Sequence, residues 1–334
     1  MIPSTNNVHT AAFNIPIHID LSIPVTLPEG VLWGLGVVYL VLVLASAIVF
    51  TMGRLRPEAD FEELRLRIRS WWVMVLIFTA ALAISRLVSL AFMAALSFLA
   101  LKEYLSITPL RRADRIVVPL LYLCIPLQFY WIHLGWYGMF IVFVPVYAFL
   151  LIPLVMVLIG RTDGFLRAAA NFHWGVMTTV FCLSHMAFLL VLPPSDGIVA
   201  GGAGLVFFLV LLTEANDVLQ FLSGKALGKR KIVPLVSPKK TWAGMIGGMI
   251  GTTTLSYFIA PYLTPFSEWQ SAAVGALIAF AGFSGDVVVS AVKRDLRLKD
   301  SGDLIPGHGG VLDRVDSLIY TAPVFFHFVY YFHY

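Results

Sequence analysis

Residues 31–52 of this chain read VLWGLGVVYLVLVLASAIVFTM, a run without a single charged side chain. A helix that crosses the hydrocarbon core of a bilayer needs about 20 consecutive apolar residues, so this stretch predicts a membrane-spanning helix. The whole chain has the same character, since 59% of its 334 residues are hydrophobic and only 13% are charged. Soluble domains carry about 25% charged residues. The composition therefore excludes a soluble globular enzyme, a disordered chain and a secreted disulfide scaffold.

The cationic residues are confined to short windows between the apolar stretches. Of the 23 Lys and Arg residues, only Arg86 lies outside five windows, which are 54–69, 102–115, 161–167, 225–240 and 293–314. Loops rich in Lys and Arg stay on the cytoplasmic side of a membrane, so we expect all five windows on that side. Each apolar stretch between two windows must then cross the membrane an even number of times.

The apolar stretches are long enough for about ten crossings. We expect one crossing each at 31–52 and 316–333, and two each at 116–159, 171–223 and 242–290, with turns near 133–137, 193–197 and 264–268. The stretch 71–101 is long for one span and short for two. We interpret it as a short helical hairpin with Arg86 at its far turn; a single tilted or re-entrant element would give nine spans. The sequence thus predicts an all-α, polytopic transmembrane helical bundle of about nine or ten spans.

The polar motifs lie in the second half of the chain, which suggests three regions. These are an N-terminal non-cytoplasmic segment (1–30), N-terminal transmembrane helices (31–200) and a C-terminal catalytic transmembrane domain (201–334). The last region contains two dense cytoplasmic loops with their adjoining helix ends, which we call the first motif loop (214–244) and the second motif loop (285–316). With ten spans both termini lie outside. The lack of an N-terminal targeting pattern favours a bacterial inner membrane over an organelle.

Two carboxylates define the chemistry that these loops predict. Asp217 and Asp286 lie near the cytoplasmic ends of apolar helices, where a charge usually faces the bundle interior and has a partner. Together they could bind Mg²⁺, which proteins commonly hold through one or two carboxylates plus substrate phosphates. The cations around them suit phosphoryl or nucleotidyl transfer, in which negative charge develops on phosphate oxygens; they are Lys239, Lys240, Lys293, Arg294 and Arg314. The glycine-rich turn 307–310 lets backbone approach a phosphate.

Simpler explanations remain open for individual residues. Cations of the 225–231 segment could act only as topology signals. Asp300 could be a turn residue, and Asp217 or Asp286 alone could interact with local backbone or a neighbouring lysine. His308 could be a loop residue without a chemical role. What favours a catalytic site is that all of these groups fall in the same two loops.

The second motif loop resembles a known family. Its residues 290–316 follow the pattern SxxKRxxxxKDxGxxIPGHGGVxDRVD, which is similar to the defining C-terminal motif of the phosphatidate cytidylyltransferases, also called CDP-diglyceride synthetases. Two more segments resemble family sequences. They are SPKKTWxG at 237–244 and the sequence around Asn216 and Asp217. The resemblance covers roughly residues 205–320. The first 200 residues match only in being hydrophobic and multi-spanning.

The resemblance implies an activity, cofactors and partners. Family members transfer CMP from CTP to phosphatidic acid, which gives CDP-diacylglycerol and pyrophosphate. They need Mg²⁺, and K⁺ is a candidate auxiliary cation. We therefore expect a membrane nucleotidyltransferase of phospholipid biosynthesis, whose partners are CTP, phosphatidic acid and membrane lipids and not nucleic acid. Because members of the family often pair, a homodimer is also an expectation, although no residue of this chain specifies it.

The resemblance also assigns roles residue by residue. The catalytic residues implied are Asp217, Asp286, Lys293, Arg294, Asp313 and Arg314. The substrate-binding residues implied are Ser237, Lys239, Lys240, Thr241, Ser290, Lys299, Asp300, His308, Gly309, Gly310 and Asp316. The metal ligands expected are Asp217, Asp286 and Asn216.

Two departures from the family pattern place the chain in a divergent branch. Many members have Ala where this chain has Gln220, and many have Glu where it has Val289. If that Glu ligates a metal, this chain must use another group, and the candidates are Glu214, Asn216 and Ser290. The lipid acceptor could therefore be another lipid phosphate, of an ether or isoprenoid type. A transporter is a weaker alternative, because charges avoid the span centres apart from Arg86. The helix pattern of CDP-alcohol phosphotransferases does not occur in the sequence.

Overall fold

The computed structural model describes residues 27–56, 60–193 and 200–334. Most of the predicted N-terminal segment 1–30 and of the predicted turn at 193–197 therefore lie outside the described residues. The regular elements are α1 (Glu29–Leu55), α2 (Glu62–Ile84), α3 (Arg86–Ile107), η1 (Arg112–Ile116), α4 (Val118–His133), α5 (Tyr137–Val142), η2 (Phe143–Ala148), α6 (Phe149–Leu158), α7 (Phe165–Val176), η3 (Met177–Cys182), α8 (Leu183–Leu189), α9 (Gly201–Leu227), α10 (Trp242–Leu263), α11 (Glu268–Asp295) and α12 (Leu312–His333).

The protein is an all-α, polytopic membrane protein, as its sequence predicts. Within the described ranges, nine helices are long and apolar enough to cross a membrane, and α12 follows them as a further long helix. Two of the nine are continuous rods with a π-helical segment inside, Tyr137–Leu158 and Phe165–Leu189. The turns expected near 133–137 and 264–268 are confirmed, because one helix ends at His133 and another at Leu263.

The ambiguous stretch 71–101 forms a hairpin of two full-length helices. Helix α2 ends at Ile84, and the Ser85 hydroxyl accepts a hydrogen bond from the Val88 amide at 3.2 Å, which caps α3. Arg86 is the first residue of α3, so it lies at the turn as expected. The predicted hairpin was too short because both helices extend past the apolar run into their charged ends, to Glu62 and to Ile107.

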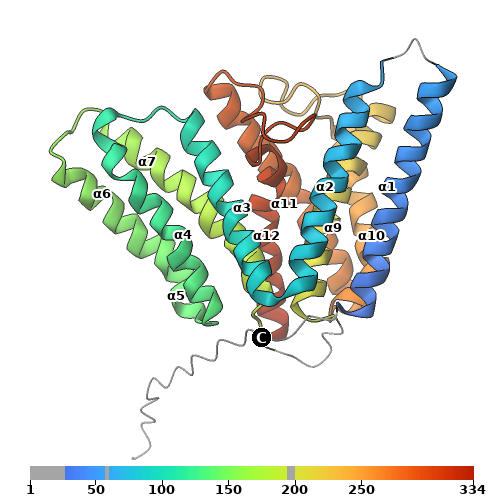
Figure 1. The fold of residues 1–334 in the computed structure, drawn as a ribbon, viewed down its shortest axis with the longest axis horizontal. Coiled ribbons are helices and arrows are strands. Elements are labelled where there is room, and N and C mark those ends of the chain that lie inside the picture. Colours follow the sequence, from blue (N-terminus) through green and yellow to red (C-terminus); the bar gives the residue numbers. More distant parts are fainter. Residues whose placement is uncertain (1–26, 57–59, 194–199) are drawn as a thin grey trace, which may run out of the picture.

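All of the cationic windows meet at one end of the bundle. Figure 1 shows the end of α1, the start of α2 and the α3–α4, α6–α7, α9–α10 and α11–α12 connections at the upper end, while the α2–α3 turn and the C-terminus lie at the lower end. We call the upper end the loop end. Both motif loops are there, side by side above α11 and α12. The helices thus bring together charged segments that are far apart in the sequence.

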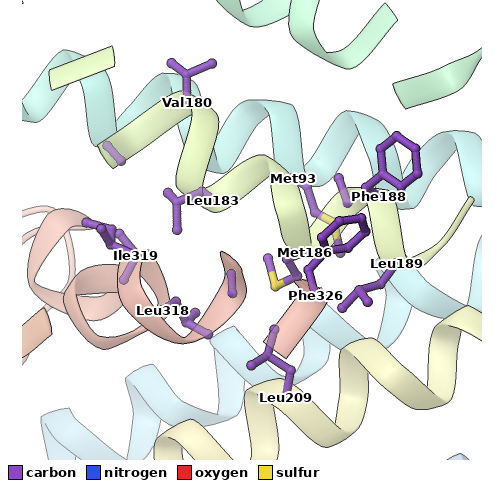
Figure 2. Close-up of a cluster of buried hydrophobic side chains, with 14 of the residues drawn as sticks. Met93, Val180, Leu183, Met186, Phe188, Leu189, Leu209, Leu318, Ile319 and Phe326 are labelled. Atoms are coloured by element: carbon purple, nitrogen blue, oxygen red, sulfur yellow. The ribbon is translucent and has the colours of Figure 1, made fainter. Parts of the chain in front are cut away.

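Helix α12 lies at the centre of the fold and joins its two halves. Figure 2 shows side chains of α3, η3, α8, α9 and α12 packed into one apolar cluster, with Phe326 of α12 among them. The labelled members are Met93, Val180, Leu183, Met186, Phe188, Leu189, Leu209, Leu318, Ile319 and Phe326. On its other side α12 touches α11 closely, because a β-carbon at Gly285 would overlap the Asp316 carbonyl oxygen. The N-terminal end of α12 is thereby held firmly at the loop end.

Helices α9 and α10 also approach each other closely. A row of glycines on α10 faces α9, and a β-carbon at Gly248 would overlap the Gln220 side chain. One at Gly247 would overlap Ser223. The first motif loop connects these two helices. Their close packing therefore places it beside the second motif loop.

Candidate functional site

A cavity of about 520 Å³ opens at the loop end between the two motif loops. Its walls come from the ends of α9, α10, α11 and α12 and from the loops that join them. The predicted site residues that line it are Asp217, Ser237, Lys239, Lys240, Thr241, Asp286, Lys293, Asp300, His308, Asp313, Arg314 and Asp316. Lys225 and Lys231, for which a topology signal was an open explanation, line it as well. The fold therefore gathers most of the predicted residues around one space.

Carboxylates from three helices form one wall of the cavity. They are Glu214 and Asp217 of α9, Asp286 of α11 and Asp316 of α12. Asp217 and Asp286 lie close enough to Asp316, and to each other, for their charges to repel. The Ser317 hydroxyl donates to Asp217 at 3.2 Å. Such a concentration of negative charge requires cations nearby to be stable.

Lys240 supplies part of that compensation. Its ammonium group lies 2.7 Å from an Asp286 carboxylate oxygen and donates to the Gln220 side-chain oxygen at 2.9 Å. Gln220, which replaces the common Ala of the family, is buried and thus fixes the lysine from the α9 side. Thr241, next in the chain, accepts a hydrogen bond from the Gly244 amide at 3.1 Å and caps α10. The start of α10 therefore orients Lys240 toward the carboxylates.

Asp313 organises the second motif loop. One of its carboxylate oxygens lies 2.6 Å from the Lys293 ammonium group. The other accepts from the Ser301 amide and hydroxyl, both at 2.8 Å, and from the Gly310 amide at 3.0 Å. At Gly309, where φ is +81°, a β-carbon would lie 2.6 Å from that same oxygen, so glycine is required there. Asp313 faces the cavity, but its bonds also hold the loop in shape.

Glu103 of α3 does not line the cavity but supports it, and nothing in the sequence predicted this role. Its carboxylate accepts hydrogen bonds from the Val311 amide at 2.7 Å and the Leu312 amide at 3.3 Å, and it contacts the Ser301 hydroxyl oxygen. The first amides of a helix have no partner within the helix, and a carboxylate there is favourable. A β-carbon at Gly310 would overlap this carboxylate. Glu103 thus caps α12 from a distant helix.

Two buried nitrogen atoms in the cavity lack a partner within the part of the chain that the structure describes. They are the Arg314 Nε and the His308 Nδ1. Buried polar groups are almost always hydrogen-bonded, so unpaired ones in a cavity mark places for a ligand. Burial lowers the pKa of His308 below its usual range, and the nearby Arg314 cation lowers it further. The imidazole is therefore neutral at pH 7, and Arg314 provides the charge.

Six of the predicted residues do not line the cavity, namely Asn216, Ser290, Arg294, Lys299, Gly309 and Gly310. Ser290 donates to Asp286 at 3.2 Å. Arg294 donates to the carbonyl oxygens of Val236 at 3.2 Å and Leu298 at 2.8 Å, which ties the two motif loops together. Lys299 is exposed, and Gly309 and Gly310 contribute backbone to the loop fold.

Asn216 lies away from the cavity, inside the helix bundle. It is fully buried, donates to the Ala279 carbonyl oxygen at 3.2 Å and accepts from the Thr252 hydroxyl at 3.2 Å. Its side chain therefore links α9, α10 and α11. Of the three groups considered as replacements for the family Glu, only Glu214 lines the cavity.

The chemistry of the donor set fits Mg²⁺. Glu214, Asp217, Asp286 and Asp316 offer hard oxygen ligands in one cavity. In the described ranges, no three His, Cys, Asp or Glu side chains are already arranged around one metal position.

The sequence is similar to those of several known proteins. A sequence model of the cytidylyltransferase family matches residues 65–332. The chain is 46% identical to YnbB of Escherichia coli (strain K12), an uncharacterized protein, over 298 residues, which are 89% of this chain and 97% of YnbB. It is 45% identical to phosphatidate cytidylyltransferase 4, chloroplastic, of Arabidopsis thaliana over 116 residues, 34% of this chain and 29% of the relative.

A third similarity is to a bacterial enzyme. The chain is 36% identical to the phosphatidate cytidylyltransferase of Mycobacterium bovis over 154 residues, 46% of this chain and 48% of the relative. The matches thus span less than half the length of both named phosphatidate cytidylyltransferases, whereas the match to YnbB is nearly complete. This pattern is consistent with a divergent branch.

Proposed function

The chain belongs to the cytidylyltransferase family and is a membrane nucleotidyltransferase of lipid synthesis, and we propose that it transfers CMP from CTP to phosphatidic acid. The products are CDP-diacylglycerol and pyrophosphate. The reaction takes place where the membrane meets the cytoplasm, because CTP is water-soluble and the acceptor is a lipid. The positive-inside distribution of the loop-end cations supports this sidedness.

The proposal rests on one observation: cationic side chains and carboxylates line the same cavity at the loop end. Lys239, Lys240, Lys293 and Arg314 line it together with Asp217 and Asp286. The unpaired Arg314 Nε–H is suited to an anionic oxygen. Nucleotidyl transfer between two phosphate groups requires such neutralisation of charge.

The chemical step is an in-line displacement. A phosphate oxygen of phosphatidic acid attacks the α-phosphorus of CTP, the bond from that phosphorus to the bridging oxygen breaks, and the electron pair leaves with pyrophosphate. A phosphomonoester is already a charged nucleophile, so no strong general base is needed. The cationic side chains hold the two phosphate groups against each other and offset the charge that develops.

Mg²⁺ would be held by Asp217 and Asp286, with Glu214 and Asp316 beside them, and would supply Lewis-acid stabilisation of the phosphate oxygens. The Lys240 ammonium group lies 2.7 Å from an Asp286 carboxylate oxygen. When substrate binds, this ammonium group could turn from Asp286 to a substrate phosphate. K⁺ as an auxiliary cation and a homodimer stay predictions from the family resemblance.

The direct test is to incubate the purified protein with labelled CTP and a panel of lipid phosphates. We expect labelled CDP-diacylglycerol from phosphatidic acid. A product from an ether or isoprenoid phosphate, with none from phosphatidic acid, would instead support a cytidylyltransferase for another lipid phosphate. No CTP consumption with any acceptor would contradict both.

Metal removal should abolish the reaction. We expect product formation to fall to background in excess EDTA and to return when Mg²⁺ is added beyond the chelator, because carboxylates alone would repel the triphosphate. Unchanged turnover in EDTA, measured with phosphatidic acid and labelled CTP, would rule out the metal.

A further inference from the structure

A second cavity, of about 400 Å³, lies between α1 and α2 at the loop end. One face of each helix lines it, because the residues recur at the three- and four-residue spacing of a helical stripe. The lining consists of Ser46, Val49 and Phe50 from α1 and Arg65, Ile68, Arg69 and Trp72 from α2. We call it the α1–α2 groove.

The base of the groove is closed and its mouth is open. The Trp72 indole N–H donates to the Ser46 hydroxyl at 3.1 Å, and deeper in the bundle the Tyr39 hydroxyl donates to Thr79 at 3.0 Å. These bonds join α1 and α2 below the groove. Figure 1 shows the two helices side by side up to the loop end. The groove has an apolar floor and opens at the level of the charged loops.

Three arginines surround the mouth. The Arg65 guanidinium reaches across to α1, where it lies 2.6 Å from the position of a β-carbon at Gly53. Arg54 lies over the Phe50 ring at 4.7 Å, and Arg69 lines the wall. In the described ranges, none of the three forms an ion pair with a carboxylate. Within these ranges, the positive charge at the mouth has no ion-pair partner.

We propose that the α1–α2 groove binds the headgroup of an anionic phospholipid of the bilayer. Arginines at the membrane surface attract anionic headgroups, and a guanidinium matches the geometry of a phosphate. One acyl chain would lie against Phe50, Ile68 and Trp72, which form the apolar floor. The arginines at the mouth suit an anionic headgroup, and the apolar floor suits an acyl chain. A phospholipid has both parts, whereas a soluble anion would make no contact with the apolar floor.

This site is separate from the catalytic cavity but adjoins it through α2. The opposite face of α2 contacts the second motif loop: Ser70 donates to the Pro306 carbonyl oxygen at 2.7 Å, and the Trp71 ring meets His308 edge-on at 6.1 Å. Arg67 packs against Gly307. A bound phospholipid would thus fix the end of the helix on which His308 and its loop rest.

The test is a lipid titration followed by native mass spectrometry of the detergent-solubilised protein. Dioleoyl phosphatidylglycerol is compared with dioleoyl phosphatidylcholine, which has the same chains but no net charge. The variant is the double replacement Arg65→Ala/Arg69→Ala. The control is Arg112→Ala/Arg115→Ala, which removes the same charge from exposed loop-end positions outside the groove.

We expect the groove variant to bind phosphatidylglycerol about 30-fold more weakly than the wild type, since each arginine contributes roughly a fivefold factor. The control should bind it as the wild type does, and phosphatidylcholine should bind all three proteins equally and weakly. Wild-type affinity in the groove variant, or an equal loss in the control, would overturn the proposal. Phosphatidylglycerol is a phosphodiester that CMP transfer does not consume, so the result is independent of the proposed activity.

Discussion

Replacing Asp286 with Asn is expected to lower CMP transfer by about 10³-fold, the size of effect seen when one electrostatic group of an active site is removed. Asp286 lines the cavity from α11 and lies 2.7 Å from the Lys240 ammonium group. Asn has nearly the same size, so packing is preserved while the negative charge is lost. The measurement is the initial rate with labelled CTP and phosphatidic acid.

A matched control separates this role from general charge loss on the same helix. Asp295 is the last residue of α11, is exposed, and lies outside the cavity that Asp286 lines. Asp295→Asn should therefore keep most of the wild-type rate. Both variants should be recovered from membranes in wild-type amounts. A normal rate in Asp286→Asn would remove Asp286 from the reaction.

Gly310→Ala is expected to have the second largest effect. The added methyl group would overlap the Glu103 carboxylate, which caps the amides of Val311 and Leu312. Overpacking of this kind costs about 1–3 kcal/mol. Here it would displace the loop that carries His308 and Asp313, so we expect activity to fall about 100-fold and the thermal midpoint of the purified protein to drop.

A double-mutant cycle with Glu103→Ala shows whether the two residues act together. Glu103→Ala alone should also lower activity, because it leaves the α12 amides without their carboxylate. In that background Gly310→Ala meets no obstacle, so the two effects should be far from additive. Gly36→Ala, where a β-carbon would meet open space, is the control and should behave as the wild type. Simple additivity would contradict the proposed contact.

The helical spans could be predicted because their physical cause is local in sequence. Each apolar stretch had to be a helix, since lipid offers its backbone no partners, and the cationic windows marked one end of every crossing. The hairpin at 71–101 was predicted too short for a related reason. Apolar length underestimates a helix whose charged end continues into water, as α2 does from Glu62.

The candidate site was predictable where charged residues stand out at the ends of apolar helices or belong to a recognisable motif. The first signal indicated Asp217 and Asp286 and the second supported Arg314, and all three line the cavity. Glu103 could not be found in this way, because its partner Val311 is 208 positions away. Nothing in the sequence near Glu103 distinguishes it from an ordinary charge at a helix end. For Asn216, the sequence placed it next to Asp217 but could not show that the two side chains point in different directions around α9.

The cap on α12 limits what can be exchanged between relatives. Phosphatidate cytidylyltransferases align with this chain over 116 or 154 residues, which invites the view that a C-terminal module could be transplanted by itself. Yet the start of α12 depends on Glu103, and the Pro306 turn rests on Ser70. A chimera that carries residues 201–334 on a foreign N-terminal half would need both of these supports rebuilt in the host before its second motif loop could fold.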